Sequence, residues 1–135
     1  MKLRLMVTVI TMSFVVLFLC QAAVAADLVK DAKNAYAQFV KAAKADNTDA
    51  VKKLLTKEAL DDLEKNNALD FFIAVQADIK PETIEAANAE VKGSTVVLKI
   101  EQVEKTKEGT ATSRATVYMV KEGGQWKVGK PEGVR

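Results

Sequence analysis

The strongest constraint on the fold is a change in hydrophobic periodicity near residue 83. Before this point, apolar residues recur every three or four positions, which is typical of amphipathic helices. After it, apolar and polar residues alternate, which is typical of strands with one buried face. Helices followed by strands indicate an α+β fold, with N-terminal helices packed on one face of a curved, four-stranded antiparallel meander sheet.

The helical half is predicted to contain one long helix and three short ones. The long helix covers residues 27–44, and three- and four-residue steps place its apolar residues on one stripe. That stripe consists of Leu28, Ala32, Ala35, Tyr36, Phe39, Val40 and Ala43. A second helix carries Val51, Leu54 and Leu55 after an N-cap at Asn47 or Thr48, a third carries Leu60 and Leu63 after a cap at Thr56, and a fourth spans 69–77. Pro81 is expected to close the helical half.

The strand half is predicted to form four strands, at 83–91, 95–104, 112–121 and 126–129. The connections are turns at 92–94 and 122–125 and a polar segment at 105–110. Alternation assigns the side chains that face the helices. These are Val96, Leu98, Ile100, Ala115, Val117, Met119, Trp126 and Val128.

The N-terminus predicts a cleaved signal peptide over residues 1–25. A basic head precedes the apolar run 5–19, and Ala23-Val24-Ala25 supplies the small residues of a cleavage site. We therefore expect a periplasmic or secreted domain of residues 26–135. The alternative is a lipid anchor at Cys20, although the bulky Leu19 precedes that cysteine. The apolar run is shorter than the roughly 20 residues of a membrane span, which argues against an uncleaved anchor. No stable span is expected after cleavage.

Composition narrows the chemistry of the predicted mature domain. Residues 26–135 carry 18 basic and 18 acidic groups, and this neutral balance argues against nucleic acid as a partner. The charge is divided, with a net −4 over residues 26–90 and a net +4 over 91–135. Histidine is absent and the only cysteine precedes the cleavage site, so zinc and copper sites are not expected. Residues 46–49 lack the ligand pattern of a calcium loop. No metal or cofactor is predicted.

Two segments resemble the nuclear transport factor 2-like superfamily. They are Ala-Lys-Ala-Asp-Asn-Thr at 43–48, which precedes Leu54-Leu55, and Val-Lys-Glu-Gly-Gly-Gln-Trp-Lys-Val at 120–128. The chain is most similar to the small, exported and often lipid-anchored bacterial branch. The resemblance implies a cone in which a curved sheet wraps helices around a cavity. That fold hosts enzymes and inert binding modules alike, so it does not assign an activity.

The cavity that the resemblance implies supplies the candidate ligand-binding residues. They are Tyr36, Phe39, Phe72, Leu98, Val117 and Trp126, and they suit a small apolar ligand. Enzymes of this fold isomerise or dehydrate small hydrophobic molecules with a shielded acid–base group. Here Glu101 and Arg114 are expected on the opposite sheet face, and Tyr36 has no evident partner. No catalytic residue is assigned, and a non-catalytic binding or interaction module is favoured; the alternative is an isomerase-like or dehydratase-like enzyme.

Two further clusters need an interpretation. The acids Asp61, Asp62 and Glu64 are interpreted as a solvated helix face. On the outer sheet face, four apolar side chains interrupt an otherwise polar surface, which favours a two-fold homodimer through that face. These four are Val97, Val103, Tyr118 and Val120.

Overall fold

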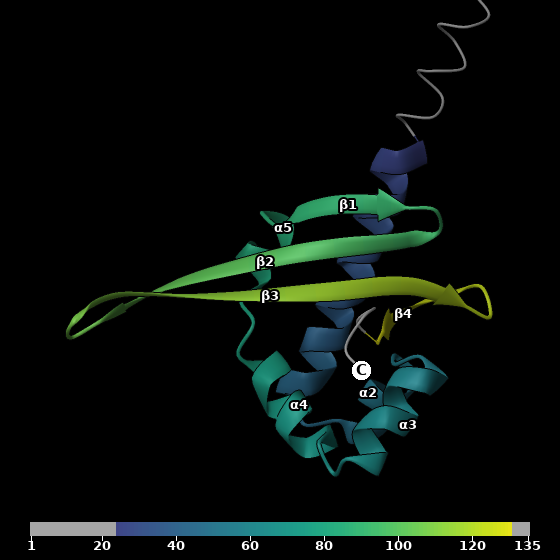
Figure 1. The fold of residues 1–135 in the computed structure, drawn as a ribbon, viewed down its shortest axis with the longest axis horizontal. Coiled ribbons are helices and arrows are strands. Elements are labelled where there is room, and N and C mark those ends of the chain that lie inside the picture. The colour runs from purple at the N-terminus through teal and green to yellow at the C-terminus, as the bar shows by residue number, and fades with distance from the viewer. Residues whose placement is uncertain (1–23, 131–135) are drawn as a thin grey trace, which may run out of the picture.

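The computed structural model describes residues 24–130, in which helices precede a single antiparallel sheet (Figure 1). The α+β prediction is therefore confirmed. The predicted signal peptide, including Cys20, lies outside the described residues except for Val24 and Ala25.

The first helix, α1, covers residues 24–44 of the described chain and lies across one face of the sheet (Figure 1). The predicted stripe is the buried side of this helix: Tyr36 and Phe39 have no exposed surface, and Val40 has almost none. Leu28 and Ala35 are half-buried at its margin. The helical period of the apolar residues thus decides which side of α1 packs on the sheet.

Helices α2 (Thr48–Lys53), α3 (Lys57–Lys65) and α4 (Leu69–Ala77) follow as a group of short helices (Figure 1). Two of the predicted caps are confirmed. The side chain of Asn47 accepts a hydrogen bond from the Ala50 N–H, and the Thr56 hydroxyl accepts one from the Ala59 N–H. These side chains satisfy backbone donors that a helix N-terminus leaves unpaired.

Residues 81–85 correct the sequence prediction. Pro81 does not close the helical half; it begins another helix, α5 (Pro81–Glu85), and buries Ile84 against the core. Proline is tolerated there because the first helical N–H has no intrahelical partner. The predicted strand at 83–91 is wrong over its first part, since Thr83 belongs to α5 and the strand begins only at Asn88.

The sheet has the order β1-β2-β3-β4, with strands β1 (Asn88–Lys92), β2 (Thr95–Thr106), β3 (Gly109–Glu122) and β4 (Gln125–Gly129). The predicted meander is confirmed. The polar connection expected at 105–110 is wrong, because β2 and β3 pair in one register from Val96↔Met119 to Thr106↔Gly109. Residues 101–114 form a two-stranded extension, here called the hairpin arm, which projects beyond the helices (Figure 1).

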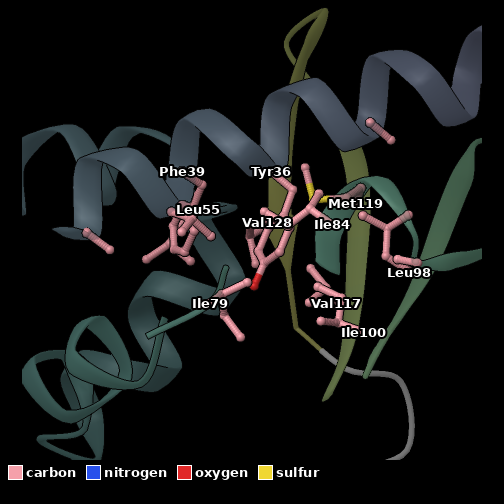
Figure 2. Close-up of a cluster of buried hydrophobic side chains, with 14 of the residues drawn as sticks. Tyr36, Phe39, Leu55, Ile79, Ile84, Leu98, Ile100, Val117, Met119 and Val128 are labelled. Atoms are coloured by element: carbon pink, nitrogen blue, oxygen red, sulfur yellow. The ribbon is translucent and has the colours of Figure 1, made fainter. Parts of the chain in front are cut away.

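The core lies between α1, the short helices and the inner face of β2, β3 and β4 (Figure 2). Val96, Leu98, Val117, Met119 and Val128 are buried there as predicted. The junction between α2 and α3 is fastened to β4 by two backbone hydrogen bonds. Thr56 donates to the Val128 carbonyl at 2.9 Å, and Val128 donates to the Leu54 carbonyl at 2.8 Å.

Candidate functional site

A groove separates the C-terminal end of α4 from the inner face of the hairpin arm. Its volume is about 330 Å³, and we call it the α4–arm groove. It is lined by Val75, Asp78, Ile79, Ile100, Gln102, Glu104, Ser113, Arg114 and Ala115. Its apolar walls come from α4, the α4–α5 connection and both strands of the hairpin, so it combines segments far apart in the sequence.

Gln102 fixes the shape of this groove. Its side-chain oxygen accepts a hydrogen bond from the Lys80 N–H at 2.7 Å. The Thr83 hydroxyl, which donates to the Lys80 carbonyl at 2.6 Å, lies 3.3 Å from the same oxygen. Its amide group donates to the Asp78 carbonyl at 3.4 Å. The side chain is buried, so these partners replace the water it loses. Gln102 therefore holds the α4–α5 connection at a set position beside β2.

The surface of α4 next to the groove is unusually apolar. Phe71 is 75% exposed and Val75 is 44% exposed, and they lie one helical turn apart on the same side. The opposite side of α4 buries Ile73 and Gln76 in the core. Large apolar side chains are usually buried, so the exposure of this side of α4 is unusual.

The buried polar groups of the core are neutral. The Tyr36 hydroxyl donates a hydrogen bond to the side-chain oxygen of Gln76. Burial raises the pKa of Tyr36 well above its ordinary value, because the core disfavours the phenolate. Within residues 24–130, the other buried polar side chains are Thr56 and Gln102, and none of these groups is charged.

The six predicted ligand-binding residues do not all come together. Tyr36 and Phe39 have ring centroids 6.1 Å apart, and Phe39 and Phe72 have centroids 6.0 Å apart. Leu98 and Val117 are buried in the same cluster (Figure 2). Trp126 is only half-buried, and Lys121 lies over its ring, 5.2 Å from the centroid. Ligand binding by these residues stays a prediction.

A small hollow next to Phe72 is the space available at this end of the core. Its volume is about 70 Å³, which corresponds to roughly two water molecules. Leu55, Leu63 and Val128 also line it.

The four apolar side chains of the outer sheet face do not form one continuous exposed surface. Val97 is 3% exposed, Tyr118 and Val120 are half-buried, and Val103 is 55% exposed on the hairpin arm. Glu101 and Arg114 are opposite each other on β2 and β3, and their side chains form an ion pair of 3.0 Å. Both lie on the outer face, as the alternation of side chains along the strands predicts. The homodimer through this face stays a prediction.

Two of the three acidic side chains in the cluster on α3 form ion pairs at the surface. Asp62 pairs with Lys130 at 3.2 Å and Glu64 pairs with Lys52 at 3.4 Å, while Asp61 is exposed. No group of acidic side chains among the described residues has the arrangement of a metal site. The solvated-face interpretation accounts for these residues.

Sequence reasoning missed Phe71, Gln76 and Gln102. Each glutamine is a polar residue at an inward position of its helix or strand, and this departure from the apolar pattern could have identified it. Phe71 carried none, because the neighbouring apolar residues of α4 mask the direction in which it points.

Comparison with known proteins does not assign the chain to a family. No protein-family model matches it, and no curated protein matches its sequence. Among the helices of residues 24–130, none combines the length and hydropathy of a membrane span.

Proposed function

We propose that this chain is an exported, non-catalytic interaction module that binds a protein partner through α4 and the α4–arm groove. The observation that carries the proposal is the solvent-facing apolar side of α4, Phe71 and Val75, beside that groove. Neutral buried groups in the core support a binding role over an isomerase-like or dehydratase-like one. The basic head and apolar run of the N-terminal sequence support export.

We also propose membership of the nuclear transport factor 2-like superfamily. A long first helix against an antiparallel meander, with the Gly-Gly turn before Trp126, supports this assignment. Because this fold serves many functions, the assignment contributes nothing to the choice of partner.

Site-specific photo-crosslinking in the native host tests the interaction role. A photoreactive benzoylphenylalanine replaces Phe71 in the full chain, and a matched control carries it at Lys41, which is exposed on α1. We expect a discrete adduct from position 71 that is absent from position 41 and is lost when Val75→Asp is added. Equal labelling at both positions, or labelling from position 71 that is unchanged when Val75→Asp is added, would contradict the proposal.

A further inference from the structure

One edge of β3 is open along much of its length. β4 pairs with β3 only between Tyr118 and Glu122, whereas β3 begins at Gly109. Within residues 24–130, no other strand pairs with residues 109–117 on that side. By contrast, α5 contacts β2 on the other strand of the hairpin.

The turn between β3 and β4 shows which backbone groups face this open edge. Gly123 and Gly124 have φ angles of 62° and 77°, the left-handed values of a two-residue type I′ turn. Such a turn is closed by a hydrogen-bonded pair, here Glu122 and Gln125. Hydrogen-bonded positions recur at every second residue along a strand. Every second residue of β3 before Glu122 therefore points its backbone N–H and C=O groups toward the same edge. On the open part of this edge, these are Thr116, Arg114, Thr112 and Thr110.

This edge lacks the usual protection against pairing with another chain. Edge strands are normally blocked by lysines, prolines, bulges or short length. Residues 109–117 contain no proline, and their pairing with β2 runs in one register without a bulge. Their one charged side chain, Arg114, is already paired with Glu101.

The α4–arm groove lies directly against this edge. Ser113 and Ala115 of β3 line it on one side, and Val75 and Ile79 line it on the other. A strand added next to β3 would alternate its side chains between the two sheet faces, so every second one would face this groove. Asp78 and Glu104 line the groove and are exposed, which favours basic groups on the added strand.

We infer that the open edge of β3 binds an extended segment of a partner protein by strand addition, with apolar side chains of that segment in the α4–arm groove and basic residues beside Asp78 and Glu104. This inference rests on the proposed function and specifies its binding mode. A second copy of this chain fits less well, because pairing of β3 with β3 would offer the groove only Ala111, Ser113 and Ala115. Those side chains are too small to fill it.

A designed peptide tests the inference on the folded domain. The probe is acetyl-Thr-Val-Thr-Leu-Thr-Lys-Thr-amide, in which the alternate residues Val, Leu and Lys share the face that would lie over the groove. Its matched control carries N-methyl groups on every second backbone amide, on the edge that would pair with β3. Binding is followed by NMR and amide hydrogen exchange. We expect slower exchange at Thr112 and Arg114 with the probe and no change with the control.

Matched variants of the protein complete the test. Thr112→Pro removes one N–H from the open edge without removing a bond to β2, and Thr112→Ala keeps that N–H. We expect Thr112→Pro to weaken probe binding by at least about fivefold, the effect of one lost hydrogen bond, and Thr112→Ala to leave it unchanged. Equal binding of the N-methylated peptide, or NMR shifts confined to the outer sheet face, would overturn the inference. Because that peptide leaves the protein unaltered, the result does not depend on how well Thr112→Pro folds.

The crosslinking assay separates this inference from the proposed function. If position 71 labels a partner and Thr112→Pro abolishes the adduct, strand addition is supported. If the adduct persists in Thr112→Pro, strand addition is wrong while the interaction role stands. An adduct with twice the mass of the chain identifies the occupant as a second copy and overturns the choice of a different protein. No adduct from any variant overturns both proposals.

Discussion

The hydroxyl of Tyr36 on α1 donates a hydrogen bond to the side-chain oxygen of Gln76 on α4, inside the core. Neither side chain has a charge, and both are buried. The bond joins two helices that are far apart in the sequence, so it sets the position of α4 relative to the long helix. The placement of the α4–arm groove, and of the exposed Phe71 and Val75 beside it, follows from this contact.

Removal of this hydroxyl should destabilise the protein. In Tyr36→Phe the oxygen of Gln76 stays buried without its donor, which costs about 1–3 kcal/mol of unfolding free energy. Urea denaturation followed by tryptophan fluorescence measures the loss. Tyr118→Phe is the matched control: this tyrosine is half-buried on the outer face, and we expect a change below about 0.5 kcal/mol. Equal losses in the two variants would show that the bond to Gln76 adds nothing.

The same tyrosine predicts a dependence of stability on alkaline pH. Burial raises the pKa of Tyr36 in the folded state above its ordinary value of about 10, so the folded protein holds the phenolic proton more tightly. The stabilisation that this bound proton gives to the folded state is complete below pH 10. It is lost as the pH rises further, because only the unfolded chain then releases the proton readily. We expect wild-type stability to fall faster than that of Tyr36→Phe above pH 10. Parallel curves of unfolding free energy against pH would contradict this.

The sequence predicted most of the helices because their signals are local. Asn47 and Thr56 cap helices that begin at the next residue, and the bounds of α4 agree with the predicted 69–77. Pro81 was misread because proline is common both after a helix and at its first position. The burial of Ile84, which depends on tertiary packing, decides between the two.

The hairpin arm escaped prediction for a different reason. Residues 103–114 are exposed on both faces, so they show no alternation of apolar and polar side chains. Only cross-strand pairing reveals that Lys107 and Glu108 form the turn of one long hairpin. The candidate site depends on this arm and on contacts such as that of Gln102 with Lys80, which no single-segment pattern contains.

Replacement of Gln102 should loosen the connection between α4 and α5. In Gln102→Leu, the Lys80 N–H loses its acceptor at 2.7 Å and the Asp78 carbonyl loses its donor. We expect a loss of about 1–3 kcal/mol and faster hydrogen exchange at the Lys80 amide than at amides of α1. Gln102→Glu, whose carboxylate can still accept a hydrogen bond from the Lys80 N–H, should preserve more of the protection at Lys80. Unchanged exchange at Lys80 in Gln102→Leu would argue that the hydrogen bond does not hold the connection.

Phe39 and Phe71 should respond very differently to truncation. Phe39 is fully buried between Tyr36 and Phe72, so Phe39→Ala should cost about 3–5 kcal/mol, a large part of a typical total of about 5–15 kcal/mol. Phe71 faces solvent, and Phe71→Ala should change the unfolding free energy by less than about 0.5 kcal/mol. Thermal and urea unfolding of the isolated domain measure both. A cost above 2 kcal/mol for Phe71→Ala would mean that its ring supports the fold itself, and the surface of α4 would no longer be available as a binding surface.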